Sequence, residues 1–515
     1  MSKELLFGAE AREKIKRGVD KISSAVAVTM GARGRTVIVQ SPYGYPLITK
    51  DGVSVARSIQ VKDNYENLGV MLIREASSKT NDVAGDGTTA TCVLAQAIYG
   101  EAYRRVSAGE DAIKLKNEIE KSVKQLSEAL SLIAKPIDTQ ETLEKVTSIS
   151  ANDKEIGKFV AQVLYETGKD GVITVEESEV PGVSVETVKG LQIEAGYAAP
   201  LVTNPDKMEC VFEAPKILVT ERPVSGALEI VPLMNKMIQA GENKLVLFAE
   251  DIRGSALNTI IINFGQQKFY ILPVKVPGMG EQQRDLMFDI ARVTGAKVFT
   301  KEVNRKLESI EMDELGSAKR VIANKGKTIV VDGAGDPEKI KEAAENNAAA
   351  IEATNILSEK EYYKKRRARL SGGIGLIRVG GSTESETKEK KQRVEDAVCA
   401  GKSAMKEGTV VGGGLALLQA WDGEVIESKI VEEAIKAPLK KIAENAGVNG
   451  DVAFAECVRT GLGFNAATGE YEDLEAAGIL DPLMVVRCSL EHGASVACLL
   501  LSTECAIVDE IEEKK

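Results

Sequence analysis

The chain has 515 residues, and its 66 Lys and Arg against 77 Asp and Glu give a net charge of −11 with the single histidine neutral. At about 150 residues per domain, this length predicts roughly two to four domains instead of one core. The acidic balance and an aromatic content of 4% argue against binding to a phosphate backbone, which requires a basic face. We therefore expect no nucleic-acid partner.

The cysteine pattern and the apolar runs indicate a cytoplasmic protein that is not embedded in a membrane. The 7 cysteines are an odd number, widely spaced, and form no C-x-x-C pair of the kind seen in zinc or redox motifs. The N-terminus lacks the apolar stretch of a signal peptide, and the longest apolar run near the C-terminus, 495–501, is far shorter than the ~20 residues a membrane helix needs. With His492 the only histidine, triad and multi-histidine metal chemistry are disfavoured.

The N-terminal third reads as mostly helical. Apolar residues at 15, 19, 22 and 26 predict a helix that ends at the glycine turn 31–34, and two short strands are expected at 37–39 and 47–48. Helical spacing returns at 67–79. A glycine-rich turn follows at 85–89, then a helix to about Tyr103 and a long amphipathic helix around 119–130.

The middle of the chain has a different pattern of apolar residues. Short β-branched runs at 172–175, 216–219 and 245–248 alternate with helical patterns, which predicts an α/β module. A charged, Ala-rich stretch follows, and its basic run 364–367 is expected to lie on a solvated helix face paired with the preceding Glu-rich segment.

Helical texture returns from Lys388 onward, so the middle module is predicted to be inserted into a helical base. Gly190 and the pair Gly372-Gly373 are either hinge points or ordinary turn glycines.

The stretch Asp82–Thr91 carries the strongest chemical signal. Its glycines would free backbone N–H groups at the start of a helix, where the helix dipole favours phosphate, and Asp86 is a candidate ligand for Mg²⁺. The alternative is a helix cap with a tight turn. Further glycine turns at 31–34, at 50–52 and at 412–414, the last following Asp396, suggest convergence on one triphosphate without establishing it.

A second signal lies in the α/β module, where a predicted helix carries Leu257 followed by three consecutive isoleucines at 260–262. At 100° per residue these three side chains cannot share one narrow stripe. Either the helix is buried nearly all round, or part of its apolar surface faces out to bind something. The preceding predicted helix has an apolar stripe that includes Val231 and Met234, and methionine suits an adaptable surface.

Six collinear motifs carry a specific resemblance. They are Thr29–Arg35, Ile48–Ala56, Asn81–Thr91, Arg393–Ala397, Gly412–Gly414 and Gly478–Pro482. With these motifs the sequence closely resembles the group I chaperonins of the GroEL type, over essentially the whole chain.

The resemblance implies a multidomain α+β fold and three domains: a mostly helical equatorial ATP-binding domain made of 1–132 and 407–515, a small hinge-like intermediate domain made of 133–189 and 374–406, and an inserted α/β apical domain, 190–373, that binds substrate.

The resemblance also implies roles for particular residues. Asp51 and Asp396 would orient or activate the attacking water, Asp86 would hold Mg²⁺, and Thr29 and Lys50 lie where the family places K⁺. Residues expected to line the nucleotide are Thr29, Gly31, Lys50, Gly87, Thr88, Thr89, Gly413, Asn465, Ala466 and Asp481. Those expected to bind substrate are Tyr197, Leu201, Val202, Val231, Met234, Leu257, Ile261 and Ile262. Gly190 and Gly373 match the hinges.

The implied function is an ATP-driven chaperonin ATPase that forms a homo-oligomeric, seven-membered ring, captures non-native polypeptides and works with a GroES-type co-chaperonin. The alternative is a non-cycling holdase or scaffold ring with the same fold. A metabolic kinase is disfavoured because no small-substrate signature accompanies the phosphate motifs. The sequence departs from the family at Ala32, Arg33, Ala90 and Asn449, which leaves nucleotide kinetics and the number of rings open.

Overall fold

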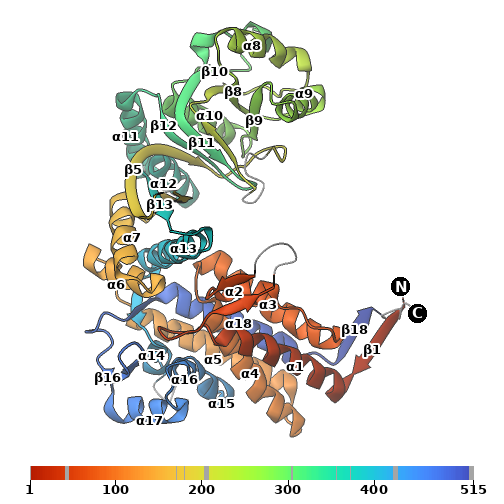
Figure 1. Ribbon diagram of the computed structural model, residues 1–515, viewed down its shortest axis with the longest axis vertical. Coiled ribbons are helices and arrows are strands. Elements are labelled where there is room, and N and C mark those ends of the chain that lie inside the picture. Colours follow the sequence, from red (N-terminus) through yellow and green to blue (C-terminus); the bar gives the residue numbers. More distant parts are fainter. Residues whose placement is uncertain are drawn as a thin grey trace. The chain divides into compact units, whose positions relative to one another are not determined.

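The computed structural model describes residues 2–40, 46–169, 171–178, 180–201, 208–302, 305–354, 356–371, 373–421 and 427–509. The chain divides into two compact units (Figure 1). Unit 1 consists of Met1–Tyr165, Val175–Ser184 and Ile377–Lys515, and unit 2 consists of Glu166–Thr174 and Val185–Leu376. Both ends of the chain therefore contribute to unit 1, as the sequence predicts for a helical base with an inserted module.

Unit 1 is mostly helical. Its elements from the first half of the chain are β1 (Lys3–Phe7), α1 (Gly8–Ala27), β2 (Val37–Val39), β3 (Leu47–Thr49), α2 (Gly52–Ser58), α3 (Asn64–Ala84), α4 (Thr88–Ser107), α5 (Ala112–Ile133), α6 (Gln140–Ala151) and most of α7 (Lys154–Thr167). Its elements from the second half are α13 (Glu384–Glu407), β14 (Thr409–Val411), α14 (Leu415–Gln419), α15 (Lys429–Ala434), α16 (Ala437–Asn445), α17 (Gly450–Thr460), β15 (Gly463–Asn465), β16 (Glu470–Glu472), β17 (Leu480–Pro482), α18 (Leu483–Leu501) and β18 (Cys505–Asp509).

The core of unit 1 forms where α1, α3, α4, α5 and α18 pack together (Figure 1). The predicted stripe of α1, including Ile15, Val19, Ile22 and Val26, is buried in this core. Aspartate caps start two of these helices, because Asp63 and Asp111 each accept hydrogen bonds from the first free N–H groups of α3 and α5. The predicted helices and short strands of the N-terminal third are confirmed.

Helix α18 is longer than the apolar run seen in the sequence. Within the described part of the chain it is the one helix long and apolar enough to cross a membrane by length and composition, and 61% of its most apolar window is buried inside the protein. It packs against α3, α4 and α5. Its apolar character is therefore that of a helix in the middle of a core.

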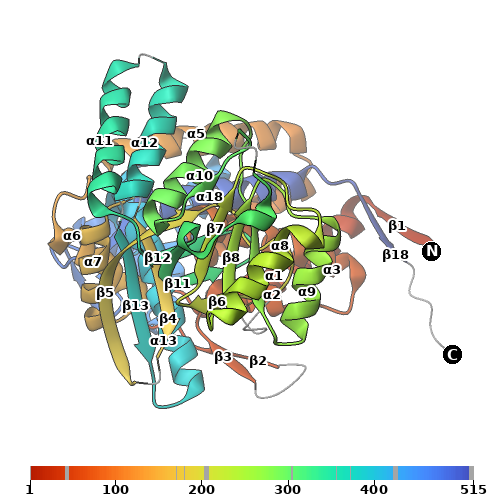
Figure 2. The same cartoon turned by 90° about the horizontal axis from the view of Figure 1, so that it is seen from above.

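Unit 2 contains β6 (Cys210–Glu213), β7 (Lys216–Thr220), α8 (Ala227–Gln239), β8 (Lys244–Ala249), α9 (Gly254–Gly265), β9 (Tyr270–Lys275), α10 (Glu281–Thr294), β10 (Val298–Phe299), the short 3₁₀ turns η1 (Leu307–Ser309) and η2 (Met312–Glu314), β11 (Gly316–Ala323), β12 (Thr328–Gly333), α11 (Pro337–Ala353) and α12 (Leu357–Ser371). The chain passes between the units in α7, β4 (Val172–Glu177), β5 (Gly182–Ile193) and β13 (Gly373–Gly380). Figure 2 shows α11 and α12 side by side.

One mixed sheet organises unit 2, with the strand order β4-β13-β5-β12-β11-β7-β8-β9. Strands β7, β8 and β9 are parallel and are joined through α8 and α9. Alternate residues of these strands enter two different cores: Val246 and Phe248 of β8 face one, and Leu245 and Leu247 face the other. Burial on both faces explains why these strands read as continuous apolar runs.

The basic run 364–367 lies on α12, as predicted, but Arg366 differs from the expected solvated face. Its guanidinium is mostly buried and donates to Asp285 and Asp289 of α10. Asp289 is fully buried, so it needs this paired cation. The partners come from an earlier helix and not from the neighbouring Glu-rich segment, which the charge pattern alone did not reveal.

Of the three candidate hinge glycines, Gly372 lies outside the described residues. Gly190 and Gly373 lie in strands and not in turns, so the turn-glycine alternative is wrong for these two. Gly373 begins β13, and Gly190 lies inside β5 opposite Val331 of β12. A Cβ atom at position 190 would lie 2.0 Å from Ile374 Cδ1 and 2.4 Å from the carbonyl oxygen of Val330. Close packing therefore requires glycine at 190, and its hinge role stays a prediction.

We expect Gly190→Ala to lower the free energy of unfolding by about 1–3 kcal/mol, because the added methyl group overlaps Ile374 and the β12 backbone. Urea denaturation measures the loss. Gly265→Ala is the matched control in the same unit, since nothing lies within 4 Å of its added Cβ. The control should be neutral or slightly stabilising, and equal effects of the two substitutions would contradict the packing argument.

Candidate functional site

The turn between α3 and α4 has the backbone of an anion site. Helix α3 ends at Gly85 with a φ of 73°, and Gly87, with a φ of 84°, precedes the first turn of α4. The N–H groups of that first turn have no partners within the helix, and the positive end of the helix dipole lies there. We call residues 85–88 the phosphate turn.

Side chains from α6, α13 and α18 hold the phosphate turn in place. Ser403 donates to the carbonyl oxygen of Ala84 at 2.8 Å, and Ser489 donates to that of Gly87 at 3.0 Å. Ser150 donates to Oδ2 of Asp86 at 3.2 Å, while Oδ1 accepts the Gly87 N–H at 2.5 Å. Sequence reasoning missed these three serines because each lies in a different helix, outside the six motifs and far along the chain from the phosphate turn.

The predicted nucleotide residues from the N-terminal region also lie beside this turn. Thr29 Oγ1 is 3.2 Å from Thr89 Oγ1. A Cβ atom on Gly52 would lie 2.3 Å from Thr89 Oγ1 and 2.8 Å from Thr88 Oγ1, so the start of α2 approaches the first turn of α4 closely. Lys50 is exposed.

Asp51 has a structural function that the motif did not reveal. Its carboxylate caps α2 by accepting the N–H groups of Val53 and Ser54, each at 3.0 Å, and the Ser54 hydroxyl at 2.6 Å. An N-cap of this kind contributes about 1 kcal/mol to helix stability. If Asp51 orients a water molecule, its carboxylate must therefore do so while it keeps its bonds to the start of α2.

The C-terminal motifs meet the same region through β14 and β17. Val410 pairs with Asp481, and a Cβ atom on Gly412 would lie 3.1 Å from Asp481 Oδ1. Gly413 has a φ of 69°, which favours glycine, and its Cβ would approach the carbonyl oxygen of Phe464 at 3.9 Å.

Asn465 and Ala466 follow Phe464 and are buried. The Asn465 side chain donates to Glu472 at 2.6 Å and accepts the N–H of Ala467 at 2.9 Å, so it is already fixed in place. Gly31, with a φ of 82°, faces Ile442 of α16.

Three aspartates from distant parts of the chain influence one another electrostatically. Burial and the nearby charge of Asp51 raise the pKa of Asp86. Burial, Asp86 and Asp51 raise the pKa of Asp396 well above its usual value. Burial and Asp86 raise the pKa of Asp481 to about 6. Within the described residues, no three carboxylate, thiol or imidazole groups already form a metal-ligand set. The cluster is nevertheless short of positive charge, a condition that a bound cation relieves.

The predicted substrate-binding residues lie in unit 2, but they differ in exposure. Ile261 and Ile262 are exposed at 42% and 56%, whereas Ile260 is buried, which answers the question of the three consecutive isoleucines. Tyr197, Val231 and Leu257 are partly buried. Leu201 and Met234 are buried in the core beneath α8 and α9 and do not lie on the surface, and Val202 lies outside the described residues.

Helix α8 adds apolar surface that the resemblance did not include. Leu228 and Ile238 are exposed at 75% and 52%. Leu228 precedes Val231 by three residues, so helical spacing alone was a usable signal for it. We refer to these two exposed side chains, together with Ile261 and Ile262 of α9, as the α8–α9 apolar surface.

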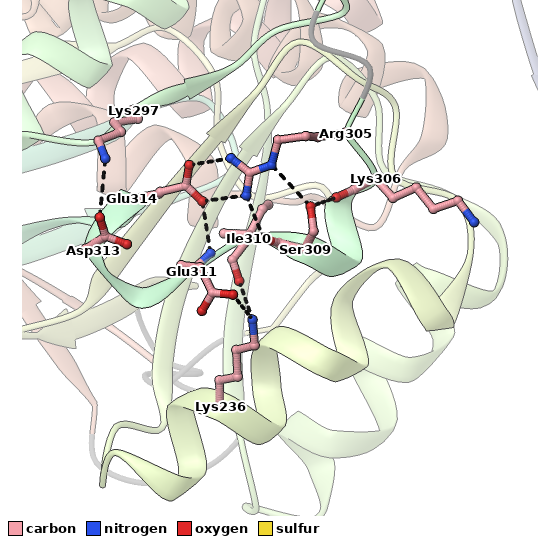
Figure 3. A network of polar contacts seen from close by, with 9 residues as sticks. All are labelled: Lys236, Lys297, Arg305, Lys306, Ser309, Ile310, Glu311, Asp313 and Glu314. Carbon is pink, nitrogen blue, oxygen red and sulfur yellow. Dashed lines mark hydrogen bonds and ion pairs between the residues drawn. The ribbon is translucent and has the colours of Figure 1, made fainter.

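A polar network anchors α8 through Lys236 (Figure 3). Lys236 of α8 donates to the carbonyl oxygen of Ile310 at 3.0 Å and to Glu311 at 2.8 Å. Arg305 makes a two-pronged ion pair with Glu314 at 2.8 and 3.0 Å. The Glu314 pKa falls because Arg305 bonds to its carboxylate, so the pair stays charged at neutral pH. The segment 305–314 therefore holds α8 in a defined position.

Comparison with known proteins identifies the family of this chain. Residues 22–510 match the TCP-1/cpn60 chaperonin family, and the chain belongs to that family. It is thus a chaperonin, as the motif resemblance predicts.

Two solved structures of a single relative show the fold. Both are crystal structures of the chaperonin gp146 from bacteriophage EL of Pseudomonas aeruginosa in the presence of ATP-BeFx. Crystal form II has a TM-score of 0.73 and form I has 0.67. At 24% identity, each match covers 98% of this chain and 99% of that chain. The multidomain α+β fold is confirmed.

We expect Asp396→Asn to raise the melting temperature of the nucleotide-free protein at pH 8, because it removes a desolvated charge that faces other carboxylates. The folded-state pKa of Asp396 lies above its unfolded value, so the wild type recovers this stability as pH falls and the carboxyl takes up a proton. The gain from asparagine should therefore shrink at pH 5.5. Scanning calorimetry at both pH values, without Mg²⁺, measures it.

Glu384→Gln is the control for that measurement, because Glu384 is exposed on the same helix and its charge is not one of those that raise the Asp396 pKa. Its effect should stay within about 0.5 kcal/mol at either pH. A lower melting temperature for Asp396→Asn at both pH values would show that the carboxylate stabilises the empty site.

Proposed function

We propose that this protein is an ATP-dependent chaperonin that hydrolyses ATP in unit 1 and captures non-native polypeptides on unit 2. The observation that carries the proposal is the gathering of the phosphate turn, Thr29, Gly52 and mutually repelling aspartates in one place. The relative gp146 was crystallised in the presence of ATP-BeFx, which supports the same ligand class here.

The chain's own groups suit a magnesium nucleotide. Backbone N–H groups of Gly87, Thr88 and Thr89 would bind phosphate oxygens, and Asp86 would bind Mg²⁺, which neutralises the carboxylates and the triphosphate together. Asp396, with its raised pKa, is suited to accept the proton of the attacking water. K⁺ would lie near Thr29 and Lys50, and Gly31, Gly413, Asn465, Ala466 and Asp481 would line the rest of the nucleotide.

We assign the domains on the basis of ATP hydrolysis in unit 1 and polypeptide capture on unit 2. Unit 1 would contain the equatorial domain, 1–132 and 407–515, together with most of the intermediate domain, and unit 2 would contain the apical domain, 190–373. Asp396 lies on α13, within the predicted intermediate domain, so movement of that domain would place or withdraw the base. Such a link would tie hydrolysis to conformation.

A homo-oligomeric ring fits two exposed strand pairs of unit 1. Strands β1 and β18 form one two-stranded sheet and β2 and β3 form another. Ile38 and Ile48, opposite each other in the second pair, are exposed at 69% and 59%. Two-stranded ribbons are marginal in water, and their free edges are templates for another chain. Seven subunits and a GroES-type lid are what the resemblance to the group I chaperonins implies, and we extend both to this chain.

We expect the purified protein to release phosphate from ATP with Mg²⁺ and K⁺, and Asp396→Ala to lower kcat by about 100-fold while ATP still binds, as loss of a general base does. Phosphate release and equilibrium nucleotide binding measure the two effects. Unchanged turnover would exclude Asp396 as the base. Binding without hydrolysis in the wild type would favour the non-cycling holdase.

We expect Ile262→Ser to weaken the capture of a chemically unfolded test protein by about three- to tenfold, because it removes exposed apolar area from the α8–α9 apolar surface. Suppression of aggregation at fixed chaperonin concentration measures capture. Asn258→Ser, which changes an exposed polar side chain on the same helix and removes no apolar area, is the control and should leave capture unchanged. Equal capture by Ile262→Ser and the wild type would exclude this surface.

A further inference from the structure

The one histidine of the chain is connected to the phosphate turn by hydrogen bonds. His492 lies on α18, and its Nδ1 is 2.9 Å from Oγ1 of Thr80 on α3. Thr80 Oγ1 is in turn 2.9 Å from Oγ1 of Thr91 on α4, which lies 3.0 Å from the carbonyl oxygen of Gly87. A continuous path therefore runs from the imidazole ring, across three packed helices, to the peptide that ends the phosphate turn.

The hydroxyl groups on this path are buried, and burying a hydroxyl costs free energy of folding. Thr80 and Thr91 are fully buried, and so is Ser489, which donates to the same carbonyl oxygen of Gly87. A buried hydroxyl destabilises a helix interface unless it is hydrogen-bonded. At position 493 glycine lets the helices close, because its added Cβ would lie 3.1 Å from the carbonyl oxygen of Thr91.

The direction of the path follows from counting protons, because each threonine hydroxyl has only one to donate. The Thr80 hydroxyl also lies 3.0 Å from the carbonyl oxygen of Ala76, one turn earlier in α3, to which it can donate. When Nδ1–H of His492 donates to Thr80, the buried Thr80 oxygen is satisfied, its proton goes to Ala76 or Thr91, and the Thr91 proton is free for Gly87. If Nδ1 lacks a proton, Thr80 donates to the ring instead, its oxygen then needs the Thr91 proton, and Gly87 loses that donor.

The carbonyl of Gly87 belongs to the same peptide as the N–H of Thr88. It accepts the Thr91 N–H at 2.9 Å in addition to the two hydroxyls. Hydrogen bonds to a carbonyl oxygen polarise its peptide and strengthen the N–H on the other side as a donor. That N–H belongs to the first turn of α4 and has no partner within the helix.

We propose that His492 is a positioning residue for nucleotide binding: its Nδ1–H satisfies the Thr80 oxygen, which leaves the Thr91 hydroxyl to donate to the Gly87 carbonyl and so prepares the Thr88 N–H for phosphate. The inference rests on the proposed function, because it assigns a role at the same site. His492 itself touches neither phosphate nor metal in this assignment.

The test compares variants of the full-length protein in steady-state ATP hydrolysis at pH 7.5. His492→Phe keeps the ring size but removes the donor, and it should raise the KM for ATP about three- to tenfold, the value of one hydrogen bond, with kcat changed less than twofold. His492→Asn presents a side-chain N–H near the Nδ1 position and should restore the KM. Ser495→Ala, exposed on the same helix, is the control for α18.

A double variant tests the path itself. Thr91→Val removes the hydroxyl without changing the shape, so adding His492→Phe to it should raise the KM no further. Additive effects, or equal KM values for His492→Phe and His492→Asn, would overturn the inference. A wild type that binds no nucleotide would instead overturn the proposed function.

A second measurement needs no nucleotide. With one histidine in the chain, [¹⁵N]histidine labelling gives a single imidazole in the nitrogen spectrum. Burial and the charge of Lys79 lower the His492 pKa, so the ring is neutral at pH 7.5. We expect the proton on Nδ1. A proton on Nε2 would mean that Thr80 donates to the ring, and the inference would be wrong.

Discussion

The packing of α18 against α3 and α4 is the constraint on which the candidate site depends. It places Ser489 against the carbonyl of Gly87 and aligns the last turn of α3 with the first turn of α4. Glycine is favoured at position 87 by its φ of 84°, and an added Cβ would lie 2.5 Å from Ser489 Oγ and 2.8 Å from Val485 Cγ1. A close-packed core thus fixes the free N–H groups of α4 in place. Because they are already positioned, no reorganisation is needed when an anion binds.

The second constraint is the mutual repulsion of buried carboxylates. Asp86, Asp396 and Asp481 come from three separate segments, and each lies in surroundings that disfavour its charged form. Such a cluster weakens the empty protein and strengthens its attraction for a cation, so stability and ligand binding are linked. The nearby thiol of Cys399 responds to the same field, since burial and Asp396 raise its pKa to about 11.

Unit 2 combines a rigid sheet with an exposed apolar surface. Its parallel strands are buried on both faces, while the outer sides of α8 and α9 leave isoleucine and leucine in water. The ion pairs of segment 305–314 hold α8 so that this surface keeps its shape. An apolar surface on a rigid support suits ligands that share hydrophobicity and little else.

The sequence by itself determined the local elements, the insertion of an α/β module into a helical base, and the glycine turn at 85–88, because periodicity and glycine act over short distances. It also pointed to Asp396 and Asp481 through motifs. Only the tertiary structure decided that Met234 and Leu201 are buried while Leu228 is exposed, that Asp51 caps α2, and that Arg366 pairs with α10. It likewise brought Ser403, Ser489 and His492 to the phosphate turn, since contacts between helices hundreds of residues apart leave no local pattern to read.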